Sequence, residues 1–110
     1  MAGSFDLKSA SNGQFHFVLR AGNGQIILSS QMYTSKSSAE GGIASVQQNC
    51  ALSERYNPDV SSNGKFYFTL KAANGQVIGN SQMYESAASR DAGIESVKTN
   101  GGTNTINDLN

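Results

Sequence analysis

The chain contains one stretch of about 40 residues twice, and this repeat limits the folds open to it more than any other feature. When the sequence is shifted by 51 positions, residues 11–50 align with residues 62–101 without a gap, and 22 of the 40 pairs are identical. Self-similarity at a fixed period indicates repeated structural units. Each unit of about 50 residues is small for a stable core of its own. We therefore expect a single domain over residues 1–110, made of two intertwined repeats at about 5–51 and 55–109.

Each copy begins with a pattern typical of β-hairpins. Phe15, Phe17 and Leu19 alternate with other residues, and turns of the form X-Asn-Gly stand on both sides of them. A two-residue loop would pair Leu7 with Val18 and Leu19 with Leu28, whereas a three-residue loop shifts each pair by one residue. The second copy favours the longer loop, because it keeps Ile27 as Ile78 but replaces Leu28 with Gly79. The predicted pairs are Leu7–Phe17, Phe5–Leu19, Leu19–Ile27, Tyr56–Leu70, Pro58–Phe68, Val60–Phe66 and Leu70–Ile78.

A helix follows the third strand of each copy. Ser35 and Ser86 stand at the N-cap positions, where a hydroxyl accepts a hydrogen bond from a free N–H of the first turn. Apolar or small residues then recur at spacings of three and four, which gives each helix one buried face. Glycine at equivalent places, Gly42 and Gly93, predicts a close approach of the helix backbone to a neighbour. The residues expected in the core are Ile43, Val46, Ile94 and Val97, packed against Phe15, Phe17, Phe66 and Phe68.

The segment between the copies reads as a strand at the edge of the sheet. Residues 52–60 lack the composition of a flexible linker and hold Pro58, the only proline of the chain. This segment serves as the last strand of the first copy and the first strand of the second, and residues 105–109 form the matching last strand. The fold class is therefore α+β, with tandem β-β-β-α-β repeats in one mainly antiparallel sheet and both helices on one face. The opposite, open face is expected to carry His16, Val18, Arg20, Ile26 and Leu28.

Several repeated motifs resemble those of the YegP-like family of small bacterial proteins. They are Asn-Gly-[Gln/Lys]-Phe-x-Phe-x-Leu-[Arg/Lys]-Ala, Asn-Gly-Gln-x-Ile, Ser-Gln-Met-Tyr and Gly-Ile-x-Ser-Val, and the likeness runs from Phe5 to about Leu109. The resemblance implies a tandem of β-β-β-α-β units whose C-terminal strands are exchanged. It implies no biochemical function and supplies no catalytic residues.

Composition excludes several classes of protein. Eight basic and eight acidic residues give a formal net charge of zero, which argues against a nucleic-acid binder. A lone cysteine cannot form an intramolecular disulfide, and no segment of 18 apolar residues or signal-peptide pattern is present. We expect a cytoplasmic monomer with internal pseudo-twofold symmetry, without a cofactor and without contact to a membrane.

No catalytic or metal-binding constellation is recognisable. His16 is the only histidine and aligns with Tyr67, and Cys50 aligns with Gly101, so neither is repeated. One Cys and one His do not suffice for a zinc site of the usual kind, and a nucleophilic cysteine needs an adjacent base. The prediction leans towards a protein that is not an enzyme.

The function expected from these patterns is that of a non-catalytic binding or interaction module. The hypothetical sites lie where each third strand meets its helix, because the Ser-Gln-Met-Tyr identity precedes a helix start in both copies. The predicted binding residues are Gln31, Tyr33, Ser35, Gln82, Tyr84 and Ser86. Two alternatives stay open. One is an enzyme with a composite site from both repeats, and the other is a single-stranded nucleic-acid binder that uses the aromatic run Phe66-Tyr67-Phe68 between Lys65 and Lys71.

Overall fold

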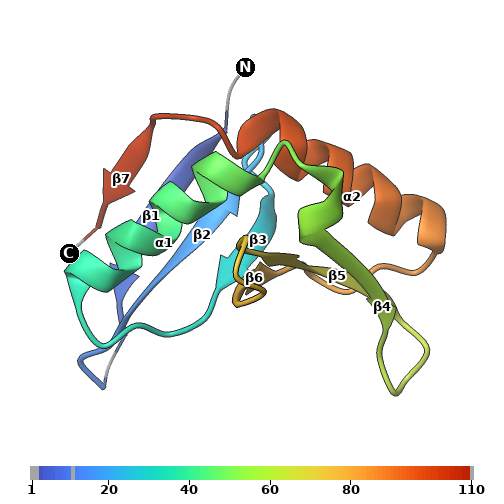
Figure 1. Cartoon of the computed structure of the whole chain (residues 1–110), viewed down its shortest axis with the longest axis horizontal. Helices are drawn as coiled ribbons and strands as arrows, with labels where there is room; N and C mark the ends of the chain where they lie inside the picture. Colours follow the sequence, from blue (N-terminus) through green and yellow to red (C-terminus); the bar gives the residue numbers. More distant parts are fainter. Residues whose placement is uncertain (1–2, 11, 110) are drawn as a thin grey trace.

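Two helices and seven strands make up the computed structural model, which describes residues 3–10 and 12–109 (Figure 1). The first copy runs through β1 (Ser4–Ser9), β2 (Phe15–Arg20), β3 (Ile26–Ser30) and α1 (Lys36–Asn49). A short 3₁₀ turn, η1 (Ser53–Arg55), leads into the second copy. That copy has β4 (Tyr56–Val60), β5 (Phe66–Lys71), β6 (Val77–Asn80) and α2 (Ala87–Asn100), and the chain ends with β7 (Ile106–Asp108).

All seven strands belong to one sheet in the order β4-β5-β6-β3-β2-β1-β7. The two copies join at the centre through the antiparallel pair β3–β6. Among the described strand pairs, β7 with β1 is parallel and the others are antiparallel. Strand β7 thus follows the helix of the second copy but completes the sheet of the first. The predicted α+β architecture with exchanged C-terminal strands is confirmed, and Figure 1 shows β4 and β7 at opposite ends of the sheet.

The first hairpin of each copy has the predicted register. Leu7 pairs with Phe17 and Phe5 with Leu19, while the second copy repeats this arrangement with Pro58 opposite Phe68. The three-residue loops place a glycine in the left-handed region, with φ of 83° at Gly13 and 82° at Gly64. Only glycine adopts this conformation without steric cost, so the Asn-Gly motif fixes the register.

The register predicted for the second hairpins is wrong by one residue. Leu19 pairs with Leu28 instead of Ile27, and Leu70 pairs with Gly79 instead of Ile78. The turns themselves have the expected three residues, because Arg20 pairs with Ile26, but a β-bulge follows at once. A bulge places two residues opposite one, which lets both Ile27 and Leu28 enter the core.

Both helices start at the predicted caps. The Oγ atom of Ser35 accepts a hydrogen bond of 3.1 Å from the N–H of Ser38, and Ser86 does the same for Ser89. In α1 the whole predicted stripe is buried, and α2 buries Gly93 and Val97. The helices therefore cover one face of the sheet and share one core cluster, which includes Phe17 and Phe68.

Three residues predicted for the core, Phe15, Phe66 and Ile94, are only partly buried. For Phe66 the cause lies in α2, where Arg90 occupies the position that Ala39 has in α1. The guanidinium of Arg90 lies 5.5 Å from the centroid of the Phe66 ring and covers it with a charged group. A long basic side chain can shield an aromatic ring in this way while its head stays in contact with water.

The C-terminal ends of the helices meet at Cys50 and Gly101, which are equivalent in the repeat. A Cβ atom added to Gly101 would lie 2.7 Å from the Cβ of Cys50, so only one of the two positions can carry a side chain. This contact explains why the copies differ here. It also buries Cys50, and burial raises the pKa of its thiol.

The open face of the sheet is less apolar than expected. Leu28 lies in the core because of the bulge, and Val18 is buried as well, so neither contributes an exposed surface. Beside Val18 on this face lies Asp6, which receives hydrogen bonds of 2.6 Å from Arg20 and 3.0 Å from Asn107 of β7. Burial acts to raise the pKa of Asp6, but these hydrogen bonds outweigh it and hold the pKa below its usual value. No helix in the described part of the chain is long and apolar enough to cross a membrane.

Candidate functional site

The segment after β3 extends the sheet and turns two side chains towards the helices. Tyr33 exchanges backbone hydrogen bonds of 2.7 and 2.8 Å with Phe15, which continues the pairing of β2 with β3. Its ring stacks on that of Phe17, with centroids 6.2 Å apart. Side chains alternate along an extended chain, so Gln31 lies on the same side as Tyr33. The second copy repeats the arrangement, with hydrogen bonds of 2.7 and 2.9 Å between Tyr84 and Phe66.

The tyrosine ring explains the glycine in each helix. A Cβ atom on Gly42 would lie 2.8 Å from Cζ of Tyr33, and one on Gly93 would lie 2.7 Å from Cζ of Tyr84. The predicted close approach is confirmed, although the neighbour is a tyrosine ring rather than the backbone of the sheet. In each copy the tyrosine ring, the helix glycine and the serine one turn further along the helix (Ser45 or Ser96) form a wall.

A cleft of about 250 Å³ lies between this wall and the second hairpin turn of the other copy. The first copy contributes the segment after β3 and the outer turns of α1, while the second copy contributes the loop between β5 and β6. The lining residues are Gln31, Tyr33, Gly41, Gly42 and Ser45 from the first copy, and Ala72, Asn74, Gln76, Val77 and Ile78 from the second. Each copy alone would supply only one side of this cleft.

A second cleft of about 200 Å³ has the same construction with the copies exchanged. It is lined by Gln82, Tyr84, Ser89, Ala92, Gly93 and Ser96 from the second copy, and by Ala21, Asn23, Gln25 and Ile27 from the first. Nine lining positions correspond between the clefts under the 51-residue shift, and eight of these pairs are identical. Only Gly41 and Ala92 differ.

The hairpin wall of each cleft is held in shape by its own turn. Oδ1 of Asn74 accepts a hydrogen bond of 3.0 Å from the N–H of Gln76, and Asn23 accepts the same bond from Gln25. Gly75 and Gly24 have φ of 85° and 87°, as these turns require. The turn therefore uses the asparagine and the glycine, but it uses only the backbone of the glutamine.

The clefts carry no formal charge among their described lining residues. Burial raises the pKa of Tyr33, and a hydrogen bond with Gln31 acts in the opposite direction without cancelling it. The phenol is therefore protonated at neutral pH. What each cleft offers a ligand is a set of carboxamide and hydroxyl groups beside a glycine-lined helix surface.

Four of the six predicted binding residues line the clefts, namely Gln31, Tyr33, Gln82 and Tyr84. Ser35 and Ser86 do not, because their hydroxyls are engaged in capping the helices. Each cap hydroxyl also donates a hydrogen bond, of 2.9 Å from Ser35 to Ser38 and of 3.0 Å from Ser86 to Ser89. The helix starts thus have internal partners, and the predicted role of Ser35 and Ser86 in binding receives no support from the clefts.

The sequence reading missed the contribution of the hairpin turns. The X-Asn-Gly motifs predict only turns, yet Gln25 and Gln76 next to them line the clefts from the opposite copy. The identity of Gln25 and Gln76 between the copies could have indicated this role, because both residues are exposed and neither side chain is needed for the turn. Ser45 and Ser96 were missed because a serine on a helix carries no pattern of its own.

The two candidates for catalysis outside the clefts do not form a site. Cys50 is buried between the helix ends with a raised pKa, which is the opposite of an activated thiolate. His16 lies on the other face of the sheet, where its Nδ1 atom is buried and has no hydrogen-bond partner within the described residues. No group of three metal-ligating side chains occurs in residues 3–10 and 12–109.

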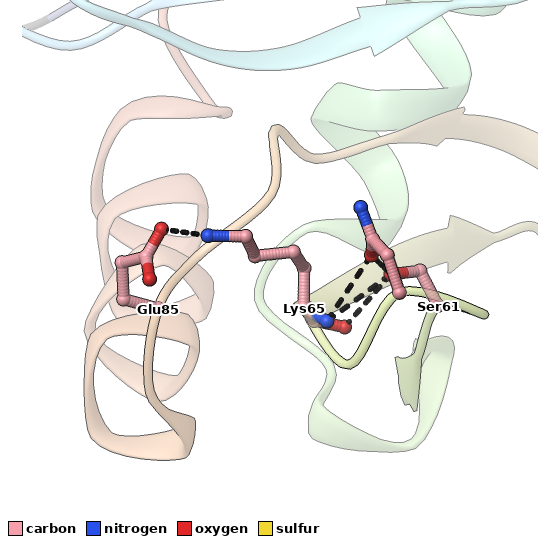
Figure 2. A network of polar contacts seen from close by, with 4 residues as sticks. Ser61, Lys65 and Glu85 are labelled. Carbon is pink, nitrogen blue, oxygen red and sulfur yellow. Dashed lines mark hydrogen bonds and ion pairs between the residues drawn. The ribbon is translucent and has the colours of Figure 1, made fainter.

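One ion pair distinguishes the outer corner of the second copy. Figure 2 shows Lys65 reaching from the turn between β4 and β5 to Glu85, just ahead of α2, while its backbone bonds to Ser61. The first copy has Gln14 and Thr34 at these positions and lacks the pair. Neither Lys65 nor Glu85 lines a cleft, and a solvent-exposed pair of this kind contributes at most about 1 kcal/mol. We interpret this ion pair as a local contact between the turn and the segment ahead of α2, and not as a functional site.

Comparisons with known proteins agree with the repeat. The family model described as "Domain of unknown function (DUF1508)" matches residues 10–57 and 61–108, once in each copy. The chain is 60% identical to the UPF0339 protein YegP of Escherichia coli over 108 residues, which is 98% of either chain. It is 57% identical to a UPF0339 protein of Shewanella oneidensis over 109 residues, or 99% of either chain.

Two solution NMR structures resemble the fold closely. That of yegP from E. coli, described as a protein of unknown function, has a TM-score of 0.94 and 60% identity, and the match covers 99% of this chain and 94% of that one. That of the S. oneidensis protein has a TM-score of 0.93 and 57% identity, with 99% and 92% covered. The names of these relatives state no activity.

Proposed function

The chain belongs to the DUF1508 family, with one family domain in each copy, and we propose that it is a binding module with two equivalent ligand sites, one in each cleft. A single observation carries the proposal. Eight of nine corresponding lining pairs are identical, which leaves 14 identical pairs among the other 31 aligned positions. Identity between the copies is thus concentrated where the clefts lie.

Packing accounts for only part of this identity. Gly42 and Gly93 are required by the tyrosine rings, and Asn23 and Asn74 by the turns. The glutamines are different, because Gln25, Gln31, Gln76 and Gln82 are all exposed and neither the hairpin turns nor the helix caps use their side chains. An exposed polar residue that is repeated in two copies supports a role in binding.

The lining supports binding rather than catalysis. Among the described residues of both clefts, tyrosine is the only ionisable type, so a general acid and base with separate pKa values are missing from the lining. The nucleic-acid alternative also loses support, since Phe68 is fully buried and cannot stack on a base. We further propose a monomer in a reducing compartment such as the cytoplasm, which agrees with a buried free thiol.

The proposal is tested by identifying the small molecules that co-purify with the protein from its own cells. We expect native mass spectrometry to show up to two identical ligands per chain. Gln31→Ala and Gln82→Ala are each expected to reduce this number to one. His16→Ala and Cys50→Ser serve as controls and leave it at two. A single ligand per chain, lost in a control variant and kept in both glutamine variants, would instead indicate one composite site.

A further inference from the structure

The lining of the clefts restricts the chemistry of the ligand. In the first cleft, Gln31, Asn74 and Gln76 present carboxamides, and Tyr33 and Ser45 present hydroxyls. The second cleft has the same five groups at the positions shifted by 51 residues. Carboxamides and hydroxyls each act as both donor and acceptor of hydrogen bonds. A ligand that matches them has donors and acceptors close together.

A charged ligand fits this lining poorly. An ion that enters a cleft gives up part of its hydration, and this loss is costly unless an opposite charge or several oriented dipoles replace the water. The described lining residues supply no charge of either sign. The residues that are identical between the two clefts therefore include no acidic and no basic side chain.

Apolar and peptide ligands fit poorly for other reasons. An apolar group would cover the carboxamides and hydroxyls and leave them without hydrogen-bond partners. An extended peptide is usually bound along a free strand edge or in a long groove, whereas these walls consist of a helix face and a hairpin turn. Each cleft lies between these two walls.

The volume of each cleft fits one small, compact ligand. Volumes of about 250 and 200 Å³ correspond to roughly seven or eight water molecules at about 30 Å³ each. A six-membered sugar ring with its hydroxyls is of this size, and each hydroxyl both donates and accepts. We propose that each cleft binds one uncharged monosaccharide unit, an inference that rests on the two-site function proposed above.

The test is an NMR titration of the ¹⁵N-labelled full-length protein, followed at the backbone N–H of Gly42 and Gly93. The neutral probes are glucose, galactose, mannose, ribose and N-acetylglucosamine. Glucuronate and glucosamine are the charged probes, and N-acetylglycinamide is a peptide-like probe. At least one neutral sugar is expected to shift both signals with one Kd, on the order of 1 mM for so small a ligand.

Variants locate the binding. Gln31→Ala is expected to weaken the change at Gly42 by about tenfold and to leave that at Gly93 unaltered, and Gln82→Ala is expected to do the reverse. No change with any of the neutral sugars, at concentrations far above 1 mM, overturns the inference.

The inference and the proposed function fail differently. If a charged probe or N-acetylglycinamide shifts both glycines and the neutral sugars do not, the ligand class is wrong and the two-site function survives. If, in addition to silence from every probe, no molecule co-purifies in two copies per chain, the function itself is wrong.

Discussion

Strands β1 and β4 hold equivalent places in the two copies, but their outer edges are closed in different ways. The outer edge of β1 pairs with β7, and the N–H of Phe5 donates a 2.9 Å hydrogen bond to the carbonyl of Thr105. Alternate N–H groups from Phe5 onward therefore point outward. Under the 51-residue shift, the corresponding outward positions of β4 are Tyr56, Pro58 and Val60.

None of these three β4 positions offers a free N–H to another strand. The N–H of Tyr56 bonds to the carbonyl of Ser53 in the 3₁₀ turn, and that of Val60 bonds to Oδ1 of Asp59 at 2.8 Å. Pro58 has no N–H at all. Unpaired strand edges promote association between chains, and proline and charged residues at the edge prevent it.

The outer edges of β1 and β4 are closed differently because the chain contains only two copies of the unit. The counterpart of β7 in the first copy is Arg55–Asn57, which the chain already uses to enter β4. Two copies therefore provide one free closing strand for two edges, and the other edge is blocked locally. The clefts show the opposite behaviour, because both are complete and nearly identical. The copies have thus diverged where the sheet ends and have stayed alike where the clefts lie.

The largest effect is expected from separating the copies. A fragment of residues 1–56 keeps β1, β2, β3 and α1 but loses the second half of the shared core and one wall of each cleft. We expect it to dimerise or to remain unfolded, as measured by sedimentation together with circular dichroism. A well-folded monomeric fragment would show that the two copies are independent units.

The helices are expected to respond unequally to the loss of their isoleucines. Ile43 is 1% exposed, and Ile43→Ala is expected to lower the free energy of unfolding by roughly 2–5 kcal/mol. Ile94 is only partly buried, so Ile94→Ala is expected to cost less, roughly 1–2 kcal/mol. Urea unfolding of both variants measures the difference. Equal losses would mean that the second helix packs as tightly as the first.

Neighbouring glycines in α1 provide a matched pair. Gly42→Ala places a Cβ atom against the ring of Tyr33, and we expect a loss of roughly 1–3 kcal/mol despite the better helix propensity of alanine. Gly41→Ala meets nothing within 4 Å and recreates Ala92 of the second copy, so a gain of up to about 1 kcal/mol is expected. Thermal melts of both variants measure these changes in stability. A gain of stability in both variants would contradict the close contact between Gly42 and the ring of Tyr33.

The blocked edge is expected to give the smallest effect on stability. Pro58→Ser restores an outward N–H without adding an apolar side chain, so weak self-association is expected at high concentration with a change in stability below about 1 kcal/mol. Asn57→Ser is the control, because Asn57 pairs with Thr69 of β5 and gains no outward donor. Analytical ultracentrifugation measures the result. If the two variants sediment in the same way, Pro58 does not prevent self-association at this edge.

Much of the fold could be predicted because its signals are local or repeated. The caps at Ser35 and Ser86 and the Asn-Gly turns act within a few residues, and the repeat itself implied a shared core. The bulge at Ile27 could not be predicted, since it depends on which of two apolar neighbours fits the core. The partial burial of Phe66 likewise depends on Arg90, which is 24 residues away in the chain.

The candidate site was half predicted for a related reason. Gln31 and Tyr33 belong to one continuous identity between the copies, which made them visible. Their partners Asn74 and Gln76 come from the other copy and are separated from them by more than 40 residues. Only the antiparallel joining of β3 to β6 brings the two sets together, and no pattern within one copy contains that information.

If the two clefts are equivalent and independent sites, filling either one leaves binding in the other unchanged. Gly41 and Ala92 are exposed, equivalent lining positions, so Gly41→Phe is designed to block the first cleft and Ala92→Phe the second. The measurement is the number of ligands bound per chain, counted by native mass spectrometry with the co-purified ligand in excess. We expect two ligands for the parent, one for each single variant and none for the double variant. Two ligands bound to the double variant, or all binding lost in one single variant and none in the other, would contradict it.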